Sequence, residues 1–375
     1  MDLSEIRKEI DNIDSQLIEL FKKRMECSRQ VANYKKATNT SIMNLKREQE
    51  ILDKVEEQGG EFGCAAQLLF SNILELSRGL QHDIIGSGKE IRKEIGSAKN
   101  SINKTKDVKI ALQGIVGSNS HEATTKLFPD CQPIFYRSFA EVFEAVNNGE
   151  ADYGVLPVEN SSAGSVADVY DLILQYRFYI VKALDLPIEH CLCSIKQSEL
   201  SDIEQVWSHP QALAQCTEFI NNHNFATVPS PNTAIAAMDI AKEKRLNCAA
   251  ICTEKAAQEY GLKVLAKGCQ NEKDNSTRFI VISKELIIPD DADKVSLCFS
   301  VPHIKGSLYN VLGRFSSNGM NLTKIESRPR DGVSFEYLFY LDFQGSVHSD
   351  KVMNMLCALS EEMPEFSFLG NYKED

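Results

Sequence analysis

Apolar residues recur at steps of three and four along the start of the chain. Ile6, Ile10 and Ile13 begin a stripe that Leu17 continues, and no Gly or Pro interrupts it. This spacing puts the apolar side chains on one face, so it predicts an unusually long helix over residues 3–36.

Two shorter helices are expected next. Segment 46–58 is ended by Gly59-Gly60, and a third helical segment covers 64–81. Three helices of which one is very long cannot bury all their apolar faces alone. We therefore expect two chains to pair as a helical homodimer.

Residues 82–106 lack a consistent apolar face and predict a connector or a fraying helical extension. Gly86-Ser87-Gly88-Lys89 looks like the end of a phosphate-binding loop. However, Asp83 stands where the first Gly belongs and Glu90 where Ser or Thr belongs, so the motif fails.

Strands and helices alternate from residue 108, which predicts a parallel sheet with helices on its faces. The expected elements are strands at 108–112, 134–136 and 153–158 and helices after Gly117 and over 139–146. A dinucleotide site is not expected, because Leu112 occupies the position of the first required Gly.

After residue 289 the order becomes strand, helix, strand, strand, helix, strand, at 295–301, 308–316, 322–327, 335–342, 349–359 and 366–369. This βαββαβ order is the ferredoxin-like α+β arrangement.

The bulk properties favour a globular, multidomain protein. The chain has 375 residues, 43% hydrophobic and 25% charged, and suggests two or three domains. No apolar run approaches the ~20 residues of a membrane span, and the N-terminus lacks the features of a signal peptide, so a cytoplasmic protein is expected. A net charge of -12 argues against nucleic acid as a partner.

The 11 cysteines are odd in number, with no Cys-x-x-Cys pair, and no His-Glu-x-x-His motif occurs. These patterns predict reduced thiols and no metal site.

The stretch Asn275-Ser276-Thr277-Arg278-Phe279 leads a polar turn into a buried strand. Thr277 and Arg278 are expected at the strand's exposed edge, where a guanidinium could fork onto a carboxylate beside a short donor. Taken alone, the stretch is better explained as a turn with a solvated Arg, and the functional interpretation depends on the rest of the chain.

Polar clusters occur at other strand ends and helix starts. They are Ser118-Asn119-Ser120-His121, Glu159-Asn160-Ser161-Ser162, Ser208-His209-Pro210-Gln211 with Gln215, and Asn232-Thr233. Each alone is typical of a helix N-cap. Together they indicate one anion-binding cleft lined by helix N-termini.

Cations on the first helix can be placed by arithmetic. Arg24 and Lys35 are eleven residues apart, so they share a face at about 16 Å, with room for a small dianion between them. Arg7 lies about 25 Å from Arg24 and about 100° around the helix, so only an intertwined dimer would bring it to the same ligand. The alternative is solvated surface cations.

These residues resemble the all-helical chorismate mutase domain of bifunctional bacterial enzymes. The matching positions are Ile6-Arg7, Arg24, Lys35, Arg47-Glu48, Ser77 and Gln81. The resemblance implies a swapped dimer in which Arg7 of one chain, with Arg24 and Arg47 of the other, binds the carboxylates of chorismate. Lys35 and Gln81 would bind the ether oxygen and Glu48 the ring hydroxyl, with Ser77 also in the site. Asn44 stands where the family more often has Asp.

The central region resembles prephenate dehydratase. The motifs are Gly-x-x-Gly-Ser at 114–118, Pro157-Val158-Glu159-Asn160 with Gly164-Ser165, Ser208-His209-Pro210-Gln211 with Gln215-Cys216, Thr233-Ala234 and Thr277-Arg278-Phe279. The resemblance implies two α/β lobes around a cleft, as in periplasmic binding proteins, with no metal or organic cofactor. Prephenate would lose carbon dioxide and its ring hydroxyl to give phenylpyruvate.

We assign Thr277 as the donor to the leaving hydroxyl, with Asn160, Ser208 and Gln215 orienting the substrate. Arg278 is expected to bind a carboxylate, with Glu159 and Thr233 also in the substrate site. Because a Thr hydroxyl is a weak acid, Glu159 stays open as the alternative proton donor.

The last eighty residues resemble the ACT regulatory domain. Gly306-Ser307-Leu308 and Glu326-Ser327-Arg328-Pro329 carry the resemblance, with Ser307 where Ala is usual. It implies phenylalanine bound between paired domains by Gly306, Ser307, Leu308, Asn321, Glu326, Ser327 and Arg328. A plain dimerisation domain is the alternative.

The expected organisation is a mutase domain over 1–90, a linker over 91–106, a dehydratase domain over 107–285 and a regulatory domain over 294–375. The predicted function is conversion of chorismate to prephenate and then phenylpyruvate, with feedback inhibition by phenylalanine. The alternatives are a catalytically inactive ligand-binding or amino-acid sensor, and an enzyme that keeps only the dehydratase activity.

Overall fold

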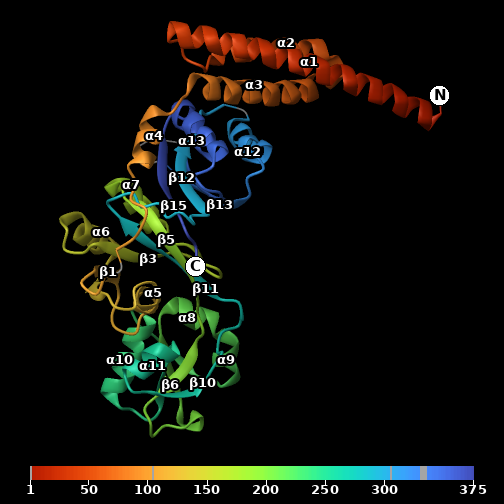
Figure 1. The fold of residues 1–375 in the computed structure, drawn as a ribbon. Helices are drawn as coiled ribbons and strands as arrows, with labels where there is room; N and C mark the ends of the chain where they lie inside the picture. The colour runs from red at the N-terminus through yellow and green to blue at the C-terminus, as the bar shows by residue number, and fades with distance from the viewer. Residues whose placement is uncertain (1, 104, 305, 330–335) are drawn as a thin grey trace. The chain divides into compact units, whose positions relative to one another are not determined.

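The computed structural model describes residues 2–103, 105–304, 306–329 and 336–375 (Figure 1). The chain divides into two compact units. One consists of Met1–Ser97 with Val295–Phe368, and the other of Ala98–Lys294 with Leu369–Asp375.

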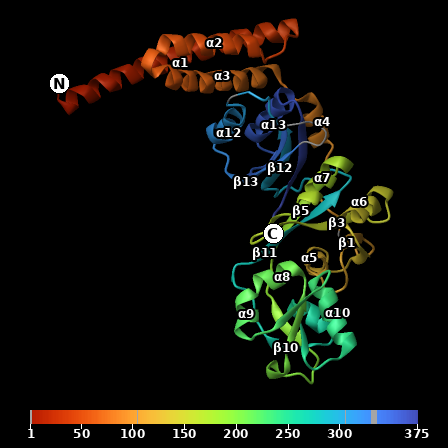
Figure 2. The ribbon, with the colours of Figure 1, turned by 180° about the vertical axis from the view of Figure 1, so that it is seen from behind.

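The first unit begins with the three predicted helices, α1 (Leu3–Thr38), α2 (Leu45–Gly59) and α3 (Gly63–Ile85), with a short 3-10 turn (Gly60–Phe62) before α3. Asp2 caps α1 by accepting from the backbone of Ser4 and Glu5, while Glu5 accepts from the backbone of Asp2. Helix α3 packs against both α1 and α2 (Figures 1 and 2).

The expected connector is partly helical. Helix α3 continues to Ile85, and a further helix, α4 (Lys89–Gly96), buries Ile91 and Ile95 and packs against α13 (Asp350–Glu362). Its apolar stripe is only two residues long, which is too short a pattern to identify a helix from sequence. Gly86 and Gly88, of the apparent phosphate motif, both have positive φ and form the turn between α3 and α4.

The C-terminal elements of the first unit form a four-stranded sheet in the order β13-β14-β12-β15. In chain order they are β12 (Lys294–Ser300), α12 (Ser307–Ser317), β13 (Leu322–Pro329), β14 (Tyr337–Gln344), α13 and β15 (Phe366–Tyr372). Phe335, the expected start of the third strand, lies outside the described residues. Helices α12 and α13 both contact α3.

The second unit has two lobes, each with its own sheet. The first sheet has the order β2-β1-β3-β11-β5, with β4 paired to β3. Its strands are β1 (Lys109–Gln113), β2 (Gln132–Tyr136), β3 (Tyr153–Asn160), β4 (Gly164–Ser165), β5 (Tyr179–Pro187) and β11 (Ser276–Ser283), and its helices are α5 (Asn119–Leu127), α6 (Phe139–Asn148) and α7 (Ala167–Tyr176).

The second lobe has the strand order β10-β6-β9-β7-β8. Its strands are β6 (Cys191–Ser194), β7 (Gln205–Ser208), β8 (Ala226–Pro229), β9 (Cys248–Cys252) and β10 (Lys263–Ala266), and its helices are α8 (Pro210–Gln215), α9 (Thr217–Asn222), α10 (Thr233–Glu243) and α11 (Glu254–Glu259), with a 3-10 turn at Leu200–Asp202.

Both sheets are mixed, so the prediction of a parallel sheet was wrong in part. Strand β1 runs parallel to β2 and β3, but β11 runs antiparallel to β3 and β5. The chain leaves the first lobe after β5 and returns only at β11, so β11 enters the sheet from the second lobe and runs against its neighbours. Its first residues therefore lie where the chain passes between the lobes.

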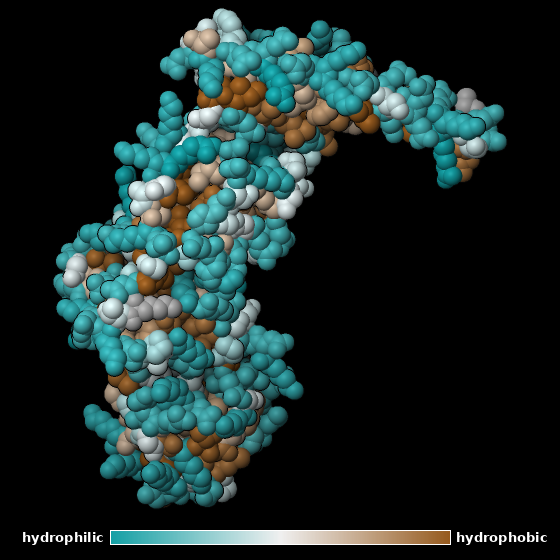
Figure 3. All heavy atoms as spheres, in the orientation of Figure 1, coloured by the Kyte–Doolittle hydropathy of each residue, from teal (hydrophilic) through white to brown (hydrophobic). Residues whose placement is uncertain are grey.

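Several large apolar side chains of α1 are exposed, including Leu3, Ile10, Leu17 and Leu20, each at least half exposed. Figure 3 shows brown apolar atoms among teal ones along these helices. Within the described ranges, no helix has both the length and the apolar character that a membrane crossing requires.

Candidate functional site

Thr277 stands at the start of β11, directly opposite Asn160 at the end of β3. The Asn160 Nδ2 donates to Thr277 Oγ1 at 2.9 Å and to Asn275 Oδ1 at 2.9 Å. All three side chains are buried. Because the Thr277 oxygen accepts from Asn160, the bond orients the hydroxyl and leaves its own proton available to donate.

The second lobe contributes Gln215, the last residue of α8, to the same group. Its Nε2 donates to Asn160 Oδ1 at 3.3 Å, and its Oε1 accepts from His190 Nε2 at 2.9 Å and from Asn275 Nδ2 at 3.4 Å. We name these five residues, Thr277, Asn160, Asn275, Gln215 and His190, the Thr277 cluster. It joins the two lobes through neutral hydrogen-bonding groups.

Burial lowers the pKa of His190 below its ordinary value, and the bond to Gln215 only partly opposes the shift. The imidazole is therefore neutral near pH 7. Since its Nε2 donates to an amide oxygen, its buried Nδ1 is the unprotonated nitrogen, and no partner is seen for it among the described residues.

Ser208 and Thr233 are not joined to this cluster by any hydrogen bond of the described residues. The fully buried Ser208 hydroxyl donates to the Ile251 carbonyl at 2.6 Å, so its single proton is already used. Thr233 is the first residue of α10, and its neighbour Asn232 caps that helix by accepting from the Ile235 backbone. At Asn232 the N-cap alternative holds.

Arg278 and Glu159 face the opposite side of the sheet from Thr277 and Asn160. Arg278 pairs in register with Glu159, and neighbouring residues of a strand point to opposite faces. The guanidinium is bound by Asp185 at 2.9 and 3.0 Å, by Glu374 at 2.8 Å and by Glu159 at 3.4 Å.

Burial alone would lower the pKa of Arg278, but the Asp185 hydrogen bond and the three carboxylates raise it above its ordinary value. With three carboxylates around it, Arg278 does not present its charge to a ligand beside Thr277. The same geometry places the Glu159 carboxylate away from the Thr277 hydroxyl. The structure therefore gives no support to Arg278 as a substrate-carboxylate partner or to Glu159 as the alternative acid.

Strand β5 also pairs with the last residues of the chain. The backbone N–H of Ala183 donates to the Lys373 carbonyl at 3.2 Å, and that of Asp375 donates to the Ala183 carbonyl at 3.1 Å. Glu374, within this segment, bonds Arg278 and Lys294. The far side of β11 is thus held by charges, and the Thr277 side by neutral groups.

In the first unit, Arg24 and Ser77 meet between α1 and α3. The Arg24 Nη1 donates to Ser77 Oγ at 2.8 Å, and Ser28 Oγ lies 3.1 Å from Ser77 Oγ. Burial lowers the pKa of Arg24, and the nearby Cys27 partly opposes this. Gln81, one turn beyond Ser77, is buried, and its Nε2 donates to the Ser77 carbonyl at 3.1 Å while its Oε1 has no partner among the described residues.

Lys35 and Glu48 also belong to this region. Lys35 Nζ donates to the Ile42 carbonyl at 2.5 Å. Burial lowers the pKa of Lys35, and the charge of Glu48 partly raises it again, so the two groups act on one another. The structure thus groups Arg24 with Ser77 and Gln81, and Lys35 with Glu48.

The remaining residues of the predicted chorismate site lie differently. Asn44 is the N-cap of α2, and its side chain accepts from the Arg47 backbone at 3.0 Å. The exposed Arg47 side chain pairs with Glu50 at 3.2 Å. Arg7 is exposed near the start of α1.

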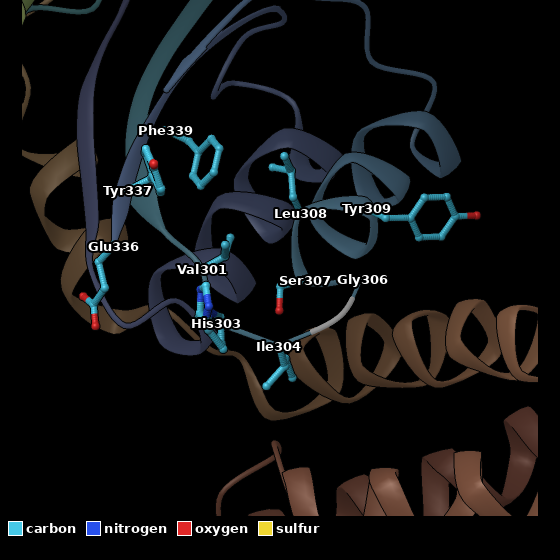
Figure 4. Close-up of a pocket in the computed structure, with 11 residues that line it drawn as sticks. Val301, His303, Ile304, Gly306, Ser307, Leu308, Tyr309, Glu336, Tyr337 and Phe339 are labelled. Carbon is cyan, nitrogen blue, oxygen red and sulfur yellow. The ribbon is translucent and has the colours of Figure 1, made fainter. Parts of the chain in front are cut away.

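The C-terminal part of the first unit has a cavity of about 520 Å³ at the start of α12 (Figure 4). Gly306, Ser307 and Leu308 line it, together with the apolar Val301 and Phe339. Gly306 has φ 81°, a left-handed conformation that favours glycine. Of the other predicted ligand residues, Ser327 pairs with Phe339 in the adjacent strand, Glu326 and Arg328 flank it, and Asn321 donates to Gln344 at 2.9 Å.

Three residues of these sites were missed by the sequence analysis. His190 lies just before β6 and Asn275 just before β11, and only the folded chain shows that both contact Gln215. Asn275 lay within the stretch singled out for Thr277, but His190 stands outside every quoted motif. Arg78, whose side chain pairs with Glu48, reads in sequence as one more cation on a helix.

Comparison with known families matches two parts of the chain. A family model described as prephenate dehydratase covers residues 110–286, and one described as chorismate mutase type II covers residues 6–82. The first range contains the whole Thr277 cluster, and the second contains every residue of the predicted chorismate site.

Individual relatives extend this match. "Arogenate dehydratase/prephenate dehydratase 1, chloroplastic" of Arabidopsis thaliana is 37% identical over 284 residues, covering 72% of each chain. A prephenate dehydratase from Arthrobacter aurescens, solved in complex with L-Phe, is 33% identical with a TM-score of 0.65, over 71% of this chain and 89% of that one.

One relative matches along nearly its whole length. The bifunctional chorismate mutase/prephenate dehydratase of Aquifex aeolicus (strain VF5) is 33% identical over 383 residues, covering 99% of this chain and 98% of the relative. The chain accordingly belongs to the family of bifunctional chorismate mutase/prephenate dehydratases, enzymes of phenylalanine biosynthesis.

Proposed function

We propose that this chain converts chorismate to prephenate at Arg24, Lys35 and Gln81, and prephenate to phenylpyruvate at Thr277, under feedback inhibition by phenylalanine bound at the α12 cavity. The observation that carries the dehydratase assignment is the Asn160 N–H bond to the Thr277 oxygen. Because the Thr277 oxygen accepts this bond, the Thr277 hydroxyl is oriented and can donate its proton in a hydrogen bond to the substrate.

In the dehydratase step, the bond between the ring and the carboxylate breaks and carbon dioxide leaves. Its electron pair enters the ring and expels the ring hydroxyl as hydroxide, which takes up a proton from solvent to become water. Thr277 donates a hydrogen bond to that oxygen, and the bond strengthens as negative charge develops there. Asn160 and Gln215 fix the direction of the hydroxyl, and aromaticity drives the step. The contribution of Ser208 is indirect, because its hydroxyl holds β7 to β9.

The mutase step needs no proton transfer and no nucleophile. It needs chorismate held in its reactive conformer, with donors on the breaking ether oxygen. Lys35 and Gln81 serve as those donors, Arg24 and Arg47 bind carboxylates, and Glu48 accepts from the ring hydroxyl. The Asn44 side chain caps α2 and so supports Arg47 and Glu48 in its first turn.

The mutase site is completed by a second copy of the chain. Arg7 lies far along α1 from Arg24, and the exposed apolar side chains of α1 give a homodimer its buried surface. In such a dimer, Arg7 of one chain reaches the carboxylates held by its partner.

Two separate assays test the catalytic proposal. The unaltered chain is given chorismate and, separately, prephenate, and each product is followed by absorbance; arogenate is offered in parallel because of the name of the plant relative. We expect both reactions. A chain that leaves both substrates unchanged would be the inactive sensor, and one active only on prephenate would have lost the mutase.

The Thr277 assignment has a matched pair of variants. Thr277→Val keeps the shape and removes the hydroxyl, so the dehydratase rate should fall about a hundredfold to a thousandfold. Thr277→Ser keeps the hydroxyl and should retain most activity. Equal losses in the two variants would show that the hydroxyl is not the active group.

Phenylalanine regulation is supported by the cavity, by the position of the start of α12 on that cavity, and by the relative solved with L-Phe. The segment Glu326–Arg328 would complete the ligand site at an interface between two copies. Phenylalanine inhibits if it binds the less active state of the enzyme more tightly than the active one.

Two glycines that flank α12 provide the test. Gly306 and Gly319 stand at opposite ends of the helix, both have positive φ, and a Cβ at either would meet open space. The strain of an Ala substitution is therefore similar, but only Gly306 lines the cavity. Gly306→Ala should raise the inhibitory phenylalanine concentration about tenfold, a change of ~1.4 kcal/mol in binding, and Gly319→Ala should not. Dehydratase rates that do not respond to millimolar phenylalanine would refute the regulation.

A further inference from the structure

The first unit contains a group of charged side chains that are almost completely buried. Glu75 and Arg78 come from α3, Arg314 from α12 and Glu362 from the end of α13, and each side chain is at most 9% exposed. His82 of α3 is 2% exposed and lies 2.6 Å from Glu362. Charged residues are seldom buried this far unless they are paired. We name these five residues, with Glu48, the Arg78 network.

Arg78 is the centre of this network. Its Nη1 binds Glu48, its Nη2 binds Glu75, and its Nε lies 3.4 Å from Glu362. Arg314 binds the same two carboxylates, Glu75 and Glu362. The two arginines and two glutamates therefore close a ring, and Glu48, at 19% exposed, extends from it toward α2.

Glu48 has two cationic neighbours with different roles. On one side it pairs with Arg78, and on the other its charge acts on Lys35. The proposed mutase reaction needs Lys35 free to donate to the ether oxygen. A Glu48 carboxylate that was not held by Arg78 would be attracted to Lys35 and would occupy that donor.

The C-terminal helices hold Arg78 in turn. Burial alone would raise the pKa of Glu362, but its bond to His82 and the charges of Arg314 and Arg78 lower it to about 2. Glu362 is therefore an anion at neutral pH and keeps the Arg78 guanidinium in place from the α13 side. Removing one partner from a buried ionic group leaves a buried charge without its counter-charge, so the stability of each member depends on the others.

We propose that Arg78 is a positioning residue of the mutase reaction, which holds Glu48 toward the chorismate hydroxyl and away from Lys35 and is itself held by Glu362 of α13. The inference rests on the proposed role of Glu48 in the mutase site. It makes the C-terminal helices part of the support of the mutase site.

The experiment uses the full chain and a double-mutant cycle. Arg78→Met, Glu48→Gln and the double variant are assayed with chorismate, and each preparation is assayed with prephenate as a folding control. Arg78→Met should lower mutase kcat/KM about tenfold or more, with most of the loss in kcat, because Lys35 stops serving the transition state. In the Glu48→Gln background the same change should cost less than about twofold.

Arg92→Met is the matched control. Arg92 lies on α4 and bonds Asn354 of α13 at 2.6 Å, so it too joins α13 to its neighbours, and the bonds seen for its side chain go to Asn354 and the Ser87 carbonyl. Its mutase kinetics should stay within about twofold of the unaltered chain. Glu362→Gln should lower mutase kcat less than Arg78→Met does, and Arg78→Lys should restore part of the activity.

Two results would overturn the inference: mutase kinetics unchanged in Arg78→Met, or a loss that adds in full to that of Glu48→Gln, which indicates a merely structural role. If Arg78→Met fails to fold, Arg78→Lys is run through the same cycle and decides by the same criteria. If the unaltered chain does not convert chorismate, the proposed function fails; if it does and Arg78→Met matches it, only this inference fails.

Discussion

The Thr277 cluster and the mutase site are held in place by opposite means. The Thr277 cluster uses amides, a hydroxyl and a neutral imidazole, and its hydrogen bonds close within one chain. The mutase site uses cations on helices, one of them far from the others, and its Glu48 is tied to a buried ionic network. The first site depends on the alignment of neutral donors, and we propose that the second depends on charge balance and on a second chain.

The proposed dependence on a second chain predicts the largest effect. Arg7→Ala and Arg24→Ala should each lower mutase activity about a thousandfold, because each removes a charged partner of a carboxylate. Prephenate dehydratase activity should remain in both variants. When the two inactive proteins are unfolded and refolded together, about half of the dimers should be mixed, and each mixed dimer should have one intact site of its two. About a quarter of all sites should therefore regain activity.

The mixing experiment separates the two architectures directly. Activity that is not recovered on mixing would mean that Arg7 and Arg24 of the same chain serve one site, or that Arg7 serves none. Either variant refolded alone is the control.

The neutral cluster predicts the next effect. Gln215→Leu should lower the dehydratase rate about a hundredfold, because it removes the bond to Asn160 and leaves buried polar groups unpaired. Gln211, exposed one turn earlier on α8, is the matched control, and Gln211→Leu should have almost no effect. Comparable losses at both positions would mean that the helix, and not the amide, is what matters.

Acid should distinguish the two regions. The pKa of Glu362 is depressed from 4.5 to about 2, so its stabilisation is fully present above about pH 4.5 and is lost as the pH falls toward 2. The pKa of His190 is also lowered in the folded protein. The fold therefore begins to lose stability at a higher pH, as the pH falls below 6.5 and the imidazole would have to take up a proton. Thermal unfolding measured against pH should therefore show two windows.

Glu362→Gln should remove on the order of 3 kcal/mol of stability at pH 7 and flatten the lower window, while leaving the upper one in place. His190→Gln should flatten the upper window and leave the lower one in place. A Glu362→Gln variant with the parent's full dependence between pH 4.5 and 2 would contradict the assignment.

The smallest effect is expected at Arg278. Its charge is paired with Asp185, Glu159 and Glu374, so Arg278→Met should change the KM for prephenate less than about threefold. A rise in KM of about fiftyfold or more would show that the guanidinium reaches a substrate carboxylate after all.

The sequence was informative where the signal is local. The stripe of Ile6, Ile10 and Ile13 predicted α1, and the polar turn before a β-branched run placed Thr277 at the start of a strand. These features depend on residues within a few positions of each other. Their structural counterparts were therefore accessible without coordinates.

The sequence was uninformative where partners lie far apart along the chain. In the sequence, Arg278 has no visible partner for its charge, because Glu374 lies far from it along the chain and meets it only in the fold. Arg78 looked like a surface cation because Glu362 and Arg314 reach it only through packing of α12 and α13 on α3. Pairing of this kind depends on the fold and leaves no periodic trace.

The most direct measurement supplies chorismate to the full-length Thr277→Val variant and follows both products over time. If the chain carries two independent sites, chorismate disappears at the parent rate, prephenate accumulates, and phenylpyruvate forms about a hundredfold to a thousandfold more slowly than with the parent. Phenylpyruvate formed at the parent rate would contradict the account.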